Sequence, residues 1–165
     1  MKCLAPVLAG LMLGACAANA QSQQTGAQGA SGMAHHEPHI LRHDSAADFE
    51  TTLANARAAV DARGFKTFAV IDHAAGAASI GEALPATTLI IFGNPKGGTP
   101  VMQAEQAMGL ELPLKMLVAE SNDGVTLVWR DMAHSFREYG ISDHPAADKM
   151  NAALKAIAEE AGRGE

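Results

Sequence analysis

The sequence "TTLIIFGNPKGGTP" at residues 87–100 carries most of the information on how this chain folds. Its first seven residues form a short apolar run, which is typical of a buried β-strand. Asparagine, proline, lysine and two glycines follow. Thr99 and Pro100 then match the N-cap and the first residue of a helix that extends to about Ala107. This stretch therefore predicts a strand, a glycine-rich loop and a helix N-terminus in succession.

The glycine-rich loop, which starts at Asn94, is a candidate site for an anion or a carbonyl oxygen. Free backbone N–H groups and the positive end of the helix dipole favour such a ligand. Gly97 and Gly98 let a ligand approach the backbone, Lys96 adds positive charge, and Thr99 caps the helix. In a P-loop, lysine directly precedes serine or threonine, so this order does not predict a nucleotide triphosphatase. The alternative is a capped connector whose glycines serve only the turn.

Hydrophobic spacing predicts the elements on either side of this stretch. Strands are expected from about Ile40, over 65–72 and as a hairpin of 114–121 with 125–130, and helices over 46–63, 74–80, 131–140 and 145–161. The resulting order, β-α-β-α-β-α-β-β-α-α, predicts an α+β domain. Its mixed or antiparallel sheet of about five strands would carry helices on one face.

The helix over 46–63 is the best defined of these elements. The order Ser-x-x-Asp from Ser45 is similar to a capping box at its start. Leu53 belongs to an apolar stripe with helical spacing, and we expect this stripe to pack on the sheet opposite Phe92 and Leu117.

Other polar residues are expected to meet the glycine-rich loop at one end of the sheet. If the strands before and after the loop pair antiparallel, Asn94 and Lys115 share that end. His73 would join them if its strand ends at the same edge, and Asp72 would then fix its tautomer. His73 is thus a candidate general acid or base, although a histidine at a strand end is more often a cap or turn residue. The ligand-binding candidates are Asp72, His73, Asn94, Lys96, Gly97, Gly98, Thr99 and Lys115.

The first 20 residues predict an export signal. Lys2 precedes an apolar run over 4–13 that is too short to span a bilayer. Leu-Gly-Ala-Cys, ending at Cys16, resembles a lipobox, so a lipid is expected on Cys16, with the protein in the outer membrane facing the periplasm. The alternative is cleavage after Ala20, which would release a soluble periplasmic or secreted protein.

Residues 21–38 are rich in Gln, Ser, Gly and His and predict a flexible tether, followed by a single domain over 39–162. Metal capture is an alternative function for the four histidines at the domain entrance, since neutral imidazoles bind transition metals. They are His35, His36, His39 and His43. The other interpretation of these histidines is a solvated tail that enters the first strand.

Composition argues against several classes of function. The chain has 18 acidic and 12 basic residues, a net charge of −6, and only 4% aromatic residues. Nucleic-acid binding requires phosphate neutralisation and, for single strands, aromatic stacking, so it is not expected. Cys3 and Cys16 are the only cysteines, so the domain itself would have no disulfide and no catalytic thiol. The sequence points to no particular cofactor.

Three stretches, residues 64–77, 87–103 and 110–131, together resemble the bacterial family called domain of unknown function 302. The similarity extends over about 40–161. It implies a TBP-like α+β fold, with a curved antiparallel sheet and helices on one face, and a tendency to form homodimers. It implies neither DNA binding nor an established activity.

The leading hypothesis is a lipid-anchored domain that binds a small anionic or carbonyl ligand. The alternatives are a small periplasmic enzyme that uses His73 and a metal-binding protein that uses the histidines near the tether.

Overall fold

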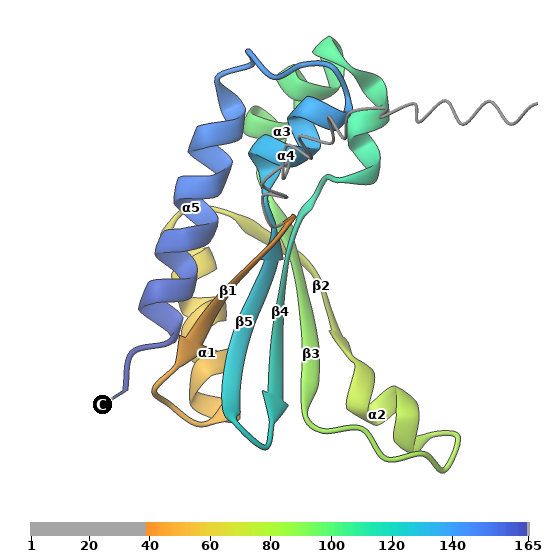
Figure 1. Ribbon diagram of the computed structural model, residues 1–165, viewed down its shortest axis with the longest axis vertical. Coiled ribbons are helices and arrows are strands. Elements are labelled where there is room, and N and C mark those ends of the chain that lie inside the picture. Colours follow the sequence, from red (N-terminus) through yellow and green to blue (C-terminus); the bar gives the residue numbers. More distant parts are fainter. Residues whose placement is uncertain (1–38, 165) are drawn as a thin grey trace, which may run out of the picture. The chain divides into compact units, whose positions relative to one another are not determined.

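The computed structural model describes residues 39–164. They form a five-stranded antiparallel sheet in the order β1-β5-β4-β3-β2, with the two longest helices, α1 and α5, on one face (Figure 1). The strands are β1 (Ile40–Ser45), β2 (Lys66–Asp72), β3 (Thr87–Gly93), β4 (Leu114–Ser121) and β5 (Gly124–Arg130). The helices are α1 (Phe49–Ala62), α2 (His73–Ala78), α3 (Pro95–Ala104), the 3₁₀-helix η1 (Gln106–Leu110), α4 (Met132–Glu138) and α5 (Ala146–Ala161). The expected α+β fold is confirmed.

Alternation of side chains along the strands gives the sheet two different faces. Ile90 and Phe92 of β3 are fully buried on the side of α1 and α5. Val60 of α1 and Leu154 of α5 complete this core, at 0% and 1% exposure. Burial of each such side chain contributes about 1.5–3 kcal/mol of transfer free energy, so the helices are held mainly by this layer.

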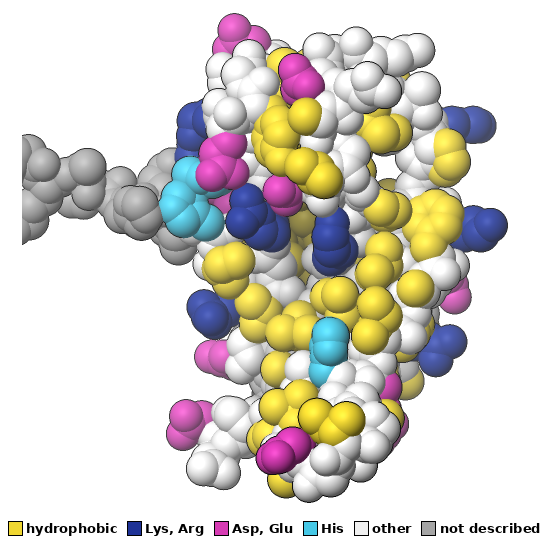
Figure 2. All heavy atoms as spheres, turned by 90° about the vertical axis from the view of Figure 1, so that its right-hand side faces the viewer, with side chains coloured by type: hydrophobic (Ala, Val, Ile, Leu, Met, Phe, Trp, Pro, Cys, Tyr) yellow, Lys and Arg dark blue, Asp and Glu magenta, His cyan; other side chains and the backbone are white. Residues whose placement is uncertain are grey.

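The opposite side of the sheet, here called the open face, carries Leu89, Ile91, Leu117 and Val128. These side chains are half-buried, whereas their sequence neighbours are buried on the helical side. Figure 2 shows a band of hydrophobic side chains on this side of the molecule, with lysine and arginine side chains nearby. The expectation that Leu117 packs under the first helix was therefore wrong. It lies opposite Leu89 in the register of β3 and β4, one residue out of phase with the buried Met116.

The first helix begins at Phe49 rather than Ala46, because Asp48 and not Ser45 is its N-cap. The Asp48 carboxylate accepts a hydrogen bond of 2.8 Å from the Thr51 N–H, and this bond lowers the pKa of Asp48. Ser45 remains in β1, where it pairs with Val125 of β5. The capping-box prediction was wrong because the Ser45 Oγ accepts from the Ala47 N–H at 3.1 Å, before the helix starts, while Asp48 accepts from the first turn.

The helix after β3 also begins earlier than the sequence predicts. Asn94 is the N-cap and Pro95 the first residue, so Gly97 and Gly98 lie inside α3 and not in a loop. Pro100 lies inside the helix, where it donates no N–H to the preceding turn. The helix ends at Ala104 and the chain continues into η1, instead of extending to Ala107.

Truncation of Leu154 tests this core. We expect Leu154→Ala to lower the free energy of unfolding by about 2–5 kcal/mol, because this side chain of α5 is buried in the hydrophobic core. The matched control is Leu110→Ala, since Leu110 is 77% exposed and should change stability very little. Urea denaturation followed by circular dichroism measures both. Similar values for the two variants would contradict the arrangement of α5 on the sheet.

Candidate functional site

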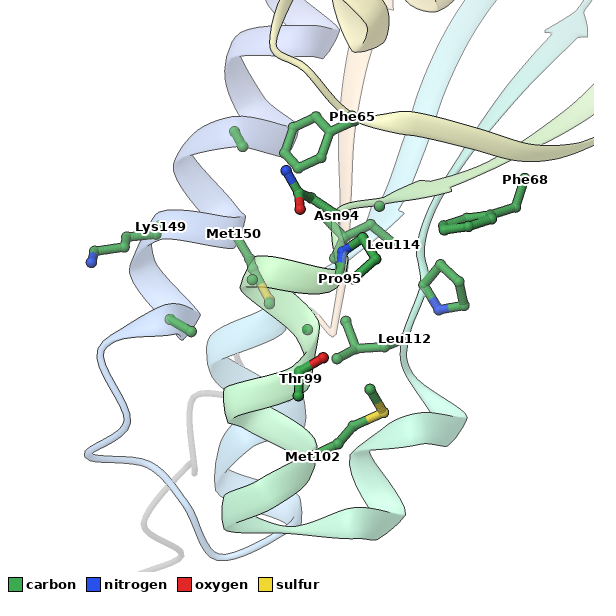
Figure 3. Close-up of a pocket in the computed structure, with 16 residues that line it drawn as sticks. Phe65, Phe68, Asn94, Pro95, Thr99, Met102, Leu112, Leu114, Lys149 and Met150 are labelled. Atoms are coloured by element: carbon green, nitrogen blue, oxygen red, sulfur yellow. The ribbon is translucent and has the colours of Figure 1, made fainter.

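A pocket of about 390 Å³ opens beside α3 (Figure 3). Its walls come from the start of β2, the end of β3, the first turns of α3, the segment 112–114 that leads into β4, and α5. Most of the lining is apolar and includes Phe65, Phe68, Met102, Leu112, Leu114 and Met150. Three lining residues have polar side chains, namely Asn94, Thr99 and Lys149. The volume lies within the range of small-molecule sites, which is about 300–1,000 Å³.

Gly97 and Gly98 keep one wall of the pocket flat. Neither has a positive φ, so neither glycine is required by the backbone conformation. A methyl group on Gly98 would lie 3.7 Å from Leu112 Cδ1 and 3.9 Å from Met102 Cε, at the pocket surface. Glycine inside a helix costs up to about 1 kcal/mol relative to alanine. The glycine pair therefore leaves space in the pocket at a cost in helix stability.

The start of α3 has no free N–H group for an anion over residues 95–98. Pro95 has no N–H, and the Lys96 N–H donates to Asn94 Oδ1 at 3.0 Å. The N–H groups of Gly97 and Gly98 both donate to the Asn94 carbonyl, at 2.9 and 3.0 Å. The predicted oxygen-binding loop is therefore not formed, because Asn94 caps the helix with its side chain and its backbone together.

Lys115 shares one end of the sheet with Asn94, as the sequence predicts, but it does not line the pocket. Its Nζ donates hydrogen bonds to the carbonyl oxygens of Glu111 and Pro113, at 2.8 and 3.0 Å. Partial burial lowers the pKa of Lys115, and nearby Arg130 acts in the same direction while Glu111 opposes it. Lys115 thus holds in place the segment 111–113, which forms part of the pocket wall.

Asp72 and His73 lie at the other end of the sheet. Asp72 pairs with Thr88, whereas Gly93, the residue before Asn94, pairs with Lys66. Five residues of strand correspond to about 17 Å, so His73 cannot act together with Asn94 and Lys115. The Asp72 carboxylate instead accepts a hydrogen bond from the Ala75 N–H at 2.8 Å and caps α2.

Two of the four candidate metal-binding histidines, His35 and His36, lie outside the described residues, as does Cys16. The His39 ring packs against the ring of His134, with centroids 3.6 Å apart, whereas His43 lies in β1 and faces Gly162. Within residues 39–164, no group of three or more histidine, cysteine or acidic side chains is arranged to hold a metal ion. No helix in this range has the length and apolar character needed to cross a membrane.

Comparison with protein families identifies the fold. A family model described as "Domain of unknown function DUF302" matches residues 41–160. The chain belongs to the DUF302 family. The crystal structure of an uncharacterized conserved DUF302 protein from Bacillus stearothermophilus has a TM-score of 0.67 to this chain. It is 15% identical in sequence and covers 77% of this chain and 100% of its own, so it shows a common fold.

Curated relatives of this DUF302 chain are similar over a shorter segment. "Fluoride-specific ion channel FluC 1" from Brucella suis biovar 1 is 43% identical over 88 residues, which are 53% of this chain and 32% of the relative. The protein of the same name from Brucella abortus biovar 1 has the same identity and segment length, with 30% of its length covered. The chain thus spans about a third of the length of these relatives.

Sequence reasoning missed the apolar walls of the DUF302 pocket, most clearly Phe68, Leu112 and Met150. These residues lie on β2, on the connection between η1 and β4, and on α5, and nothing in the spacing of the sequence brings them together. A local signal was present in Gly98 and Met102, which are four residues apart and so share one face of a helix. That signal requires a helix that starts at Pro95.

The helix start is testable by removing the two competing caps. We expect Asn94→Ala to lower the free energy of unfolding by about 1 kcal/mol, because the Lys96 N–H would lose its acceptor. Thr99→Ala is the control and should have no such effect, since Thr99 lies inside α3. Chemical denaturation measures both values. The opposite ranking would mean that the helix starts at Thr99.

Proposed function

We propose that this DUF302 domain binds a small, mostly apolar molecule in the pocket beside α3. The observation that carries the proposal is a cavity of about 390 Å³ with apolar walls and a glycine pair at its surface. Phe68 and Met102 are 48% and 37% exposed although both line this cavity. Exposed apolar surface in a concave site is typical of ligand pockets, because binding removes that surface from water.

The pocket changes the class of ligand expected from the sequence. An anion held by backbone N–H groups is not supported, since those of residues 96–98 already have acceptors within the chain. The Thr99 hydroxyl is available as a directional group among the lining residues, and Figure 3 shows its oxygen on the side of α3 toward Leu112. A ligand carbonyl or hydroxyl group would bond there.

Binding of the uncharged fluorescent probe N-phenyl-1-naphthylamine tests this proposal. The full-length chain carries Cys16→Ser, so that neither an attached lipid nor detergent competes for the probe. We expect Gly98→Leu to weaken binding at least about ten-fold, because the new side chain fills the pocket while the helical backbone tolerates it. Gly76→Leu is the matched control, since Gly76 lies in α2 and has open space around it. Equal affinity for the two variants would overturn the proposed site.

We also propose that the protein is exported and held at the outer membrane by a lipid on Cys16. The proposal rests on the signal-like first 20 residues, on the lipobox, and on Ala17 in place of an aspartate. Detergent-phase partitioning should recover the native chain with the detergent and the Cys16→Ser chain in water. Identical partitioning would instead favour cleavage after Ala20.

A second candidate function rests on the curated relatives. There a similar segment of 88 residues belongs to chains named as fluoride-specific ion channels, so this domain would serve a fluoride-conducting membrane protein. Cells lacking the gene should then lose resistance to sodium fluoride but not to sodium chloride. The functions of His73 as an acid or base and of the histidines as metal ligands gain no support from the described geometry.

Homodimer formation stays a prediction. The open face is where it would be tested, because Leu89, Ile91, Leu117 and Val128 lie there without a covering long helix. If a second copy buries this face, Ile91→Lys should prevent dimer formation. Sedimentation velocity measures the oligomeric state of the wild-type and Ile91→Lys chains.

A further inference from the structure

Building on the proposed binding role, we propose that the pocket takes an amphipathic carboxylate. An alkyl or aromatic body would lie inside, and the carboxylate would lie at the mouth. The apolar walls account for the body, since Phe68, Leu112 and Met150 line the cavity from three separate segments of the chain. The charges around the opening account for the carboxylate.

The lining of the pocket is unusual for this chain because it contains no acidic residue. Acidic residues outnumber basic ones by 18 to 12 in the whole sequence, and yet Lys149 is the charged residue among those that line the cavity. Figure 3 shows the Lys149 side chain extending from α5 away from the other labelled lining residues. Its long, flexible stem must turn back for the ammonium to meet an anionic group, which would then lie at the mouth, because the interior is lined by uncharged side chains.

One more lysine stands close to a residue that lines the pocket. Lys66 Nζ lies 5.7 Å from the centre of the Phe68 ring, and Phe68 lines the pocket. Lys96 follows Pro95 in α3 but is not itself among the lining residues. The two lysines that contact or line the pocket, Lys66 and Lys149, come from β2 and α5.

These three lysines also differ from the other two lysines of residues 39–164 in their partners. Lys115 donates to two backbone carbonyls, and Lys155 forms an ion pair with Glu159 at 3.7 Å. Lys66, Lys96 and Lys149 have no ion pair within the described residues. Their charge is thus available to a ligand, whereas exchange of an existing partner would cancel most of the gain.

The apolar body and the charged head of the ligand should contribute separately to its affinity. Each methylene added to the body should strengthen binding by about four-fold until the cavity is full. The head should add about three- to five-fold at low ionic strength, because exposed ion pairs are weak and screened by salt. A comparison of decanoate with 1-decanol separates the two terms, since the two molecules share the chain and differ in the head.

The test is displacement of N-phenyl-1-naphthylamine from the full-length Cys16→Ser chain at 20 mM and 500 mM sodium chloride. We expect decanoate to compete about three- to five-fold better than 1-decanol at the lower salt, with the difference shrinking at the higher salt. Lys149→Glu should abolish this preference while leaving 1-decanol unchanged. Lys155→Glu is the matched control, since it lies on the same helix outside the pocket and should keep the preference.

Equal competition by decanoate and 1-decanol, or equal weakening of both by Lys149→Glu, would overturn the carboxylate assignment and leave the apolar pocket in place. Failure of the probe and of both competitors to bind would overturn the pocket as well. Decanoyl lysophosphatidylglycerol forms a third arm, because a membrane lipid offers a similar chain with an anionic phosphate. Competition by this lipid but not by decanoate would also overturn the assignment to a free carboxylate.

Discussion

The cap that Asn94 places on α3 is the interaction on which the site depends. Its side chain accepts from the Lys96 N–H, and its carbonyl accepts from Gly97 and Gly98. These bonds start the helix directly after β3, and they use the N–H groups that would otherwise attract an anion. The same start turns Gly98 toward Leu112 and Met102, so that a pocket replaces the anion site.

The sheet holds two walls of the pocket in place, because its side chains alternate between two faces. The helical side buries residues such as Ile90 and Leu154, which hold α5 in place as one wall of the pocket. On the open face, Lys115 binds the carbonyl oxygens of Glu111 and Pro113 and so holds the opposite wall. Partial burial disfavours the charged form of the Lys115 amine and so lowers its pKa.

Stability and binding are in opposition at the glycine pair. A helix interior favours alanine over glycine by up to about 1 kcal/mol at each position, yet two consecutive glycines stand in α3. Their backbone angles do not call for glycine, so the lack of a side chain is what they contribute. The lining of the pocket next to these glycines is mostly apolar and includes one charged residue, Lys149, and no acidic residue.

The sequence by itself determined the order of elements, the five strands and the DUF302 resemblance, because hydrophobic periodicity and turn residues act over a few neighbours. It placed Asn94 and Lys115 at one end of the sheet, since an antiparallel pair requires this. Tertiary structure alone decided the start of α3, the position of His73 at the far end, and the meeting of Phe68, Leu112 and Met150. Cap choice is a competition between nearby acceptors, and a pocket is made by residues distant in sequence, so neither follows from local spacing.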